Sequence, residues 1–476
     1  MTDQTAWPAS GREGAGDCAP RGDAAATTGK PGGVSRRSLF RATGAGAAIL
    51  GGGTLLDACS SGLKGASGSS GGSGSASKEI TIGWIHPVTG PLSGFGAPDA
   101  WVTQQVMSTP QFKNGIKIGG STYKITIKSY DSQSSSTTAG TQAKQAIQQD
   151  NVDMLFASST PETVNEVASQ AEALGVPLVC ANIPWESWYL NLGGNPQKPT
   201  LKPKYTVMYF LGAEHLALCF LPMWNKIGGK SNDHLVAAAF PNDSDGNAFR
   251  AVFPPLLQSK GYKMALSSPY PDGTTNYSSM ISQFKDVKAD FFTNAPLPPD
   301  FATMWKQSVQ QGFRPKLATV AKVLLFPPDA YAMGNLAYNI ATDTWWVPSL
   351  PWHSSLTGET CQELADAFTA AGHGQPNANI SNYTLFEIAY KAFSSVNNPH
   401  DREEVAAALY KVSLPEAVAG PIDYTSSKNP APGVAITPPV GIQWQKGTKY
   451  PLEAKVVDNT LLPQAQITGD LLPTFS

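Results

Sequence analysis

The sequence predicts an α/β fold of two similar lobes, each built on a mostly parallel sheet and joined to the other by a hinge of several strands. Short apolar strands alternate with amphipathic helices in units of about thirty residues, which is typical of parallel sheets with right-handed crossovers. This alternation occurs once after Lys78 and starts again at Leu235. Two separate runs of the same pattern indicate two lobes rather than one continuous sheet.

The first run begins at Lys78. Ile80, Ile82 and Trp84 alternate with polar or small residues, which predicts a half-buried strand. The two helices that follow place their apolar residues on one face, and Gly175 is expected to end the second of them. The predicted elements are strands over 80–84, 152–156 and 176–180 and helices over 137–149 and 163–174.

The second run has the same order, and Gly312 is expected to close its last helix. The predicted elements are strands over 235–240, 262–266 and 290–293 and helices over 248–257, 280–287 and 301–309. Residues 205–211 are predicted to cross between the lobes, and residues 344–348 to return. Helices over 383–396 and 401–410 would then rejoin the first lobe.

Composition narrows the class of protein. The chain has 476 residues, 41% of them hydrophobic, and 11 tryptophans, which is enough to bury a core. A formal net charge of −2 gives no electrostatic reason to expect nucleic acid as a partner. At most two of Cys180, Cys219 and Cys361 can pair, and we expect all three to be small buried thiols.

The N-terminal residues form an ordered export pattern. Arg36 and Arg37 precede a weakly apolar, glycine-rich run over 42–56, and the run ends at Leu56-Asp57-Ala58-Cys59. The paired arginines resemble a twin-arginine signal, and the final four residues resemble a bacterial lipobox. We therefore expect residues 1–58 to be a signal region and 59–77 to be a flexible Gly/Ser linker behind a lipidated Cys59. The protein would work outside the cytoplasm, anchored to the cell membrane.

Several local patterns, taken in order, resemble the leucine-binding family of periplasmic binding proteins, the type I solute receptors of ABC importers. The resemblance covers roughly 78–447. The patterns are Thr89-Gly90-Pro91-Leu92-Ser93 after the first strand, Asp131 before an alanine-rich helix, Ser158-Ser159-Thr160, Gly175-Val176-Pro177, Asn242-Asp243-Ser244-Asp245-Gly246 and Gln311-Gly312-Phe313.

The resemblance implies a small-molecule receptor that closes around its ligand by hinge motion and delivers it to a permease and ATPase complex. We expect a monomer without a cofactor. The first lobe would comprise 78–206 and 347–420 and the second lobe 207–346, with crossover strands and a tail over 421–476. The same cleft would serve equally well in a membrane-tethered sensor that does not transport its ligand, and this alternative stays open.

Ligands of open α/β sheets bind beyond the carboxyl ends of the strands, so the loops there supply the candidate contacts. Ser159 and Glu162 have the spacing of a capping box, which is the structural alternative to an anion site in this loop. The predicted ligand-binding residues are Phe95, Ser158, Ser159, Thr160, Trp185, Asn242, Asp245, Asn294 and Lys322.

Two departures from the amino-acid binders shape the ligand hypothesis. After the strand over 176–180 the resemblance implies small residues and a threonine, but Asn182-Ile183-Pro184 stands there. The resemblance implies a carboxylate in the loop around 319–322, but Ala321 and Lys322 stand there. The expected ligand is an amino acid or an aromatic or branched carboxylate or amide. The departures favour a carboxylate held by Lys322 and the Ser158 to Thr160 loop over a simple amino acid. The alternative for Lys322 is an ordinary surface lysine.

An enzyme is not expected. The six histidines lie far apart in the sequence, without the short spacing of a metal site, and no Gly-x-Ser-x-Gly nucleophile elbow occurs after the linker, from residue 78 on. Catalytic triads form in space and not in sequence, so only the fold can test this expectation further.

Overall fold

The computed structural model describes residues 78–228 and 234–476. The predicted signal region, with Arg36, Arg37 and the lipidated Cys59, lies outside the described residues, as does the linker. Within the described part, no helix is long and apolar enough to cross a membrane.

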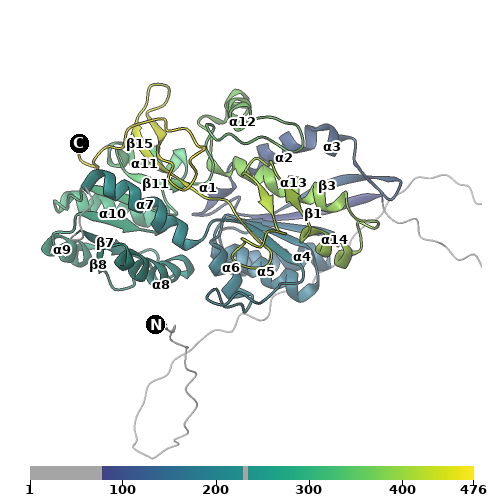
Figure 1. The fold of residues 1–476 in the computed structure, drawn as a ribbon, viewed down its shortest axis with the longest axis horizontal. Helices are drawn as coiled ribbons and strands as arrows, with labels where there is room; N and C mark the ends of the chain where they lie inside the picture. The colour runs from purple at the N-terminus through teal and green to yellow at the C-terminus, as the bar shows by residue number, and fades with distance from the viewer. Residues whose placement is uncertain (1–77, 229–233) are drawn as a thin grey trace, which may run out of the picture. The chain divides into compact units, whose positions relative to one another are not determined.

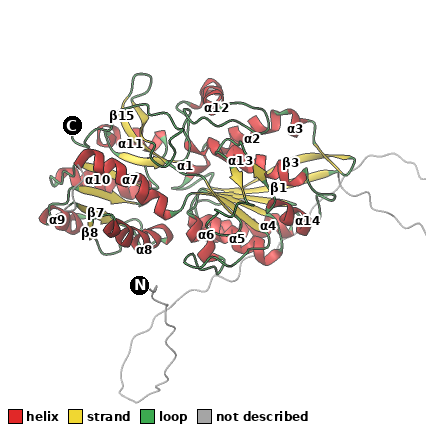
Figure 2. Ribbon diagram, in the orientation of Figure 1, coloured by secondary structure: helices red, strands yellow, loops and turns green. Residues whose placement is uncertain are grey.

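The first lobe is built on a seven-stranded sheet in the order β14-β6-β5-β4-β1-β3-β2, in which only the pairing of β2 with β3 is antiparallel. In Figures 1 and 2, α4, α5 and α6 lie along one face of this sheet, and α2 and α13 along the other. The strands are β1 (Glu79–His86), β2 (Ile116–Ile118), β3 (Ser121–Asp131), β4 (Met154–Ser158), β5 (Leu178–Ala181), β6 (Thr206–Phe210) and β14 (Val434–Ile436). The helices are α1 (Ser93–Gly96), α2 (Asp99–Ser108), α3 (Pro110–Lys113), α4 (Ser136–Gln148), α5 (Pro161–Leu174), α6 (Trp185–Asn191), α12 (Cys361–Phe368), α13 (Tyr383–Phe393) and α14 (Arg402–Leu409).

The second lobe is built on a seven-stranded sheet in the order β16-β15-β11-β10-β9-β7-β8, which is parallel except for β15 and β16. The strands are β7 (Leu235–Ala239), β8 (Lys263–Leu266), β9 (Phe291–Asn294), β10 (Leu317–Val320), β11 (Ala341–Thr344), β15 (Val440–Lys446) and β16 (Leu452–Asp458). The helices are α7 (Ala213–Gly228), α8 (Ser244–Ser259), α9 (Ser278–Asp286), α10 (Pro298–Gln310) and α11 (Pro327–Met333). A two-stranded ribbon, β12 (Ser413–Leu414) with β13 (Ile422–Asp423), and short helices over Gly334–Ala337, Thr369–His373 and Ala378–Asn382 complete the chain.

The predicted fold class is confirmed, and so are the strand and helix runs that carried it. Gly175 caps α5 with φ +68°, the left-handed conformation that glycine adopts most easily. The sequence did not predict the C-terminal strands individually. β14 joins the first sheet, whereas β15 and β16 extend the second.

The chain crosses between the lobes three times. β6 belongs to the first sheet, so the first crossing comes after Phe210, slightly beyond the predicted boundary at residue 206. The chain leaves the second sheet after β11, and residues 345–348 of the predicted return segment form no strand. The third crossing runs from β14 to β15.

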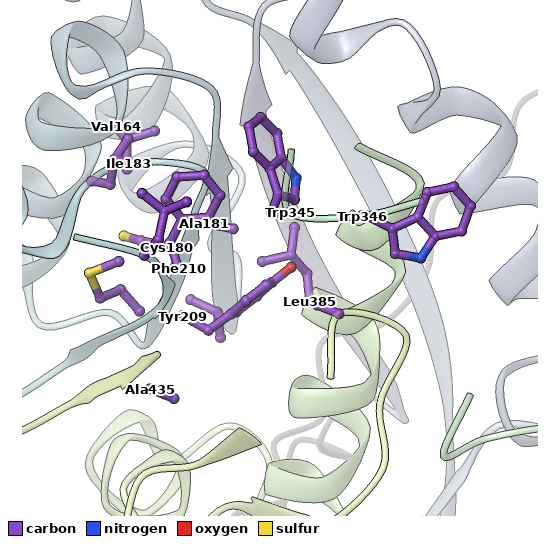
Figure 3. Packing of buried hydrophobic residues seen from close by; sticks show 14 of the residues in the cluster. Val164, Cys180, Ala181, Ile183, Tyr209, Phe210, Trp345, Trp346, Leu385 and Ala435 are labelled. Carbon is purple, nitrogen blue, oxygen red and sulfur yellow. The ribbon is translucent and has the colours of Figure 1, made fainter. Parts of the chain in front are cut away.

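Large aromatic and aliphatic side chains are buried in both lobes. Figure 3 shows part of this core, in which Phe210 from the first sheet lies beside Trp345. The indole rings of the adjacent Trp345 and Trp346 point in different directions in this view. Cys180, Cys219 and Cys361 are free and buried, as expected.

Candidate functional site

A pocket lies where loops from the two lobes meet, and the space between its lining atoms is about 400 Å³, part of which is open to solvent. Most of its lining comes from residues just after the carboxyl ends of strands, as expected for open α/β sheets. The first lobe contributes Phe95, Ser159, Thr160, Pro161, Asn182, Pro184, Phe210 and Leu211. The second lobe, together with the segment that follows β11, contributes Leu216, Asp245, Phe249, Lys322, Leu325, Asp343 and Trp345.

Aromatic rings form one part of the pocket wall. The ring centroids of Phe210 and Trp345 lie 4.8 Å apart in an edge-to-face arrangement. Phe95 lies edge-on to Phe326 at 4.8 Å, and its ring is nearly parallel to that of Trp345 at 6.5 Å. Buried aromatic faces of this kind bind flat or branched apolar groups.

Charged side chains gather around Lys322, which is buried with its side chain 5% exposed. Its Nζ lies 2.9 Å from Asp245 Oδ2, 3.0 Å from Asp243 Oδ2 and 3.5 Å from Glu162 Oε1. Glu162 belongs to the first lobe and Lys322 to the second, so this ion pair connects the lobes beside the pocket. Lys322 also has φ +67°, a conformation that is uncommon for a residue with a side chain.

The pKa shifts of this cluster follow from its burial and its charges. Burial would lower the pKa of Lys322, but the three carboxylates outweigh it and hold the pKa well above its ordinary value. Burial would raise the pKa of Glu162, but the charge of Lys322 outweighs it and keeps the pKa below the ordinary value. Burial raises the pKa of Asp245, because Lys322 only partly offsets it and Glu162 and Asp243 add to it. The positive charge of Lys322 is therefore neutralised by the carboxylates around it, and the cluster as a whole has an excess of negative charge.

Several polar atoms of the pocket lining are buried and have no hydrogen-bond partner among the described residues. They are Ser159 Oγ, Thr160 Oγ1, Asn182 Oδ1 and Asp343 Oδ1. Asp343 is 2% exposed, and burial raises its pKa to about 7. An unpaired buried polar group costs about 1–3 kcal/mol, so a ligand that supplies the missing partners would bind favourably.

The structure brings five of the nine predicted ligand residues to the pocket: Phe95, Ser159, Thr160, Asp245 and Lys322. The other four have partners within the protein and do not line it. Ser158 Oγ accepts a hydrogen bond from Trp84 Nε1, Trp185 Nε1 lies 3.5 Å from Glu214 Oε1, Asn242 Oδ1 accepts from Asn247, and Asn294 Nδ2 lies 3.3 Å from Met304 Sδ. The ligand-binding role of all nine stays a prediction.

Two of the alternatives considered from the sequence are wrong. The first is the capping box. The N-cap of α5 is Thr160 rather than Ser159, and the Thr160 side chain makes no capping hydrogen bond. The second is the solvated surface lysine, because Lys322 is buried and paired.

Sequence reasoning missed Phe210, Asp343 and Trp345 as lining residues. The segments of Phe210 and Trp345 were predicted only as crossovers between the lobes, and Asp343 lies just before the predicted return segment over 344–348. A residue at the end of a crossover strand also lies at the edge of the sheet where ligands bind, and this rule would have selected Phe210. Asp343 had no such signal, because a single aspartate within a strand is equally compatible with an exposed edge.

A second polar arrangement lies in the first lobe and does not contribute to the pocket lining. Asp99 Oδ2 lies 2.6 Å from His86 Nδ1, and His86 Nε2 lies 2.7 Å from the exposed Ser129 Oγ. These are the distances of a catalytic triad. Ser129, however, lies within strand β3, and Asn382 also donates to Asp99 Oδ1 at 2.8 Å. We interpret the arrangement as structural, because it ties α2 and residue 382 to the first sheet.

Comparisons with known proteins agree with this fold. A family model described as periplasmic binding protein matches residues 79–438. The Leu/Ile/Val-binding protein homolog 7 of Brucella abortus is 23% identical over 412 residues, which cover 82% of this chain and 95% of that protein. The homolog 8 of the same organism is 21% identical over 396 residues, covering 80% and 93%.

Solved structures of the same fold cover most of the chain. A leucine-binding protein LivK from Thermotoga maritima has a TM-score of 0.65 and 17% identity, covering 80% of this chain and 99% of that one. A solute-binding protein of an ABC transporter from Rhodopseudomonas palustris, in complex with 3,4-dihydroxybenzoic acid, has a TM-score of 0.62 and 15% identity, covering 83% and 99%. These likenesses concern the fold, and the family match covers most of the chain. The protein belongs to the leucine-binding family of periplasmic binding proteins.

Proposed function

We propose that this protein is the extracytoplasmic solute receptor of an ABC importer, and that it binds one small molecule in the pocket between its lobes. The observation that carries the proposal is the pocket itself, whose lining comes from both lobes and includes buried polar atoms without partners. The Rhodopseudomonas palustris protein in complex with 3,4-dihydroxybenzoic acid and a Streptococcus pneumoniae LivJ in complex with isoleucine are similar in fold. They support a small organic molecule as the ligand class.

Closure around the ligand is the proposed mechanism. The ion pair between Glu162 and Lys322 joins the lobes beside the pocket, and the rings of Phe95 and Trp345 face the same space. A ligand that contacts both lobes binds the closed state more tightly than the open state. This difference in affinity sets how far the ligand shifts the protein toward the closed state. The receptor performs no chemistry on the ligand, and the permease and ATPase complex is its partner.

A broad thermal-shift screen of amino acids, amines, amides and aromatic acids tests the binding function. A ligand at 100 times its Kd should stabilise the fold by about 2.7 kcal/mol. The hit is then measured by calorimetry with two matched variants, Phe95→Leu in the pocket and Phe112→Leu in the core of the same lobe. We expect only Phe95→Leu to weaken binding. Equal effects of both variants, or a screen without any hit, would count against this pocket as a receptor site.

We also propose that the receptor reaches the cell surface by twin-arginine export and stays there through a lipid on Cys59. The support is the order of Arg36, Arg37, the apolar run and Cys59 in the sequence. Two or more acyl chains hold a protein at a membrane firmly, whereas one chain does not. Mass spectrometry should find an acylated Cys59 at the mature N-terminus, and Cys59→Ala should release the protein from membranes. An unmodified Cys59 in membrane-bound protein would refute the anchor.

A further inference from the structure

We infer that the ligand is an amine, with a primary ammonium group that pairs with Asp343 and an aromatic or branched apolar body, and that the pocket rejects free carboxylates. This inference rests on the proposed function and specifies the ligand class of the same pocket. It replaces the hypothesis, drawn from the sequence, of a carboxylate held by Lys322.

The features that would attract a carboxylate are already occupied by the protein. Lys322 Nζ has Asp243 and Asp245 within 3.0 Å and Glu162 at 3.5 Å. The N-terminus of α5, which carries a partial positive charge, has the Glu162 carboxylate in its first turn. A ligand carboxylate would therefore meet surplus negative charge at both places and would have to displace an existing partner.

The unpartnered atoms of the pocket favour a donor instead. Asn182 Oδ1 and Asp343 Oδ1 are buried acceptors without partners among the described residues, and the free hydroxyls of Ser159 and Thr160 can also accept. Asp343 is the only one of these four with a carboxylate. In contrast to Asp245, its pKa is shifted by burial alone, with hydrogen bonds from its own strand opposing the shift and no contribution from a cation. A ligand ammonium would supply that missing counter-charge.

The rest of the ligand follows from the apolar wall. Asp343 and Trp345 are separated by one residue and both line the pocket, so an amine at Asp343 places its carbon skeleton beside the rings of Trp345 and Phe210. Phe249, Leu216 and Leu325 complete the apolar lining. An amine with a flat or branched hydrocarbon body matches this combination.

Proton release gives the inference a second readout. Asp343 must be ionised to pair with an ammonium, and burial raises its pKa to about 7 in the empty pocket. Amine affinity should therefore rise with pH up to about 8, and binding near pH 6 should release a proton. The titratable groups around Asp343 are Cys219 on α7 and Asp458 on β16, with Lys322 and Asp245 in the same pocket lining. Cys219 does not titrate in this range, because burial raises its pKa well above the ordinary value.

The test compares amines and acids with the same hydrocarbon body, using the full-length protein in calorimetry. The pairs are phenylethylamine with phenylpropanoate and isopentylamine with isocaproate. We expect at least one amine to bind, its paired acid to bind at least about tenfold more weakly, and Asp343→Asn to weaken the amine about ten- to hundredfold. The control is Asp329→Asn, which removes a half-buried carboxyl outside this pocket, one whose pKa burial raises to about 6.

Each other outcome overturns the inference. An acid that binds more tightly than its amine, an amine whose affinity survives Asp343→Asn, or affinity that does not change between about pH 6 and pH 8 contradicts it. Failure of all four probes to bind overturns it as well. The proposed receptor function is judged separately by the broad screen, so a tight carboxylate ligand would end this inference and leave the receptor function standing.

Discussion

Replacing Lys322 with methionine should strongly destabilise the protein, and more so at high pH. The substitution keeps a long side chain and removes an ammonium group that is 5% exposed and lies within 3.0 Å of Asp243 and Asp245. Removing one partner of a buried ion pair costs about 3–5 kcal/mol, because the remaining charge stays buried without compensation. Glu162 should add to this loss, because both of its carboxylate oxygens are buried although its side chain as a whole is 27% exposed.

The pH dependence follows from the carboxylates that remain. Burial already raises the pKa of Asp245 to about 7 although Lys322 opposes the shift, and without Lys322 it moves still further above its value in the unfolded state. The unfolded variant then loses its protons at a lower pH than the folded variant, so its stability falls as pH rises above about 4. The difference in unfolding free energy between wild type and variant should therefore be larger at about pH 8 than at about pH 5.

Urea unfolding at the two pH values measures this difference. The matched control is Lys316→Met, because Lys316 pairs with Asp290 at a similar distance of 2.8 Å but is 50% exposed. An exposed pair of this kind contributes about 0–1 kcal/mol. If Lys322→Met cost no more than Lys316→Met, or if its cost did not depend on pH, the reasoning about the buried cluster would be refuted.

Three further predictions concern other parts of the fold. Gly246→Ala should cost about 1–3 kcal/mol in urea unfolding, because its Cβ would lie 2.1 Å from the backbone oxygen of Pro241, and an unchanged midpoint would contradict the packing there. Burial and the neighbouring Glu214 raise the pKa of Glu186, so the contribution of Glu186 to stability falls as pH rises above about 5. At about pH 8, Glu186→Gln should therefore be more stable than wild type by at least about 1 kcal/mol. Parallel profiles of stability against pH for the two proteins would rule this out. Ser129→Ala should leave ligand affinity unchanged, and covalent labelling of Ser129 by a fluorophosphonate would show instead that the polar arrangement in the first lobe is reactive.

The repeated strand and helix pattern was enough to predict the two lobes. Their buried strands are nearly continuous apolar runs, and helices such as α4 and α5 carry one apolar face, so burial leaves a clear periodic signal in the sequence. The positions of the C-terminal strands β15 and β16 were harder to predict, because the strand that joins them to the sheet lies far away in the sequence. No local pattern states which sheet a terminal strand will join.

The candidate site was predictable only in part. Residues in loops directly after parallel strands, such as Ser159 and Lys322, follow from the rule that ligands bind at that edge. The ion-pair partners of these residues could not be predicted in this way, because the contact between Lys322 and Glu162 joins two lobes and spans 160 positions of sequence. The prediction of a carboxylate ligand followed from this gap. A lysine whose carboxylate partners are not known is expected to bind an anionic ligand.

The interleaved path of the chain has a consequence for how the protein is made. Each sheet contains a strand from the last tenth of the sequence, β14 in one and β16 in the other. Neither lobe can therefore be produced as one continuous fragment, and a ribosome must synthesise β14 or β16 before the corresponding half is complete. Contacts between distant segments also slow folding, so newly made chains should depend on protection from aggregation until these strands emerge.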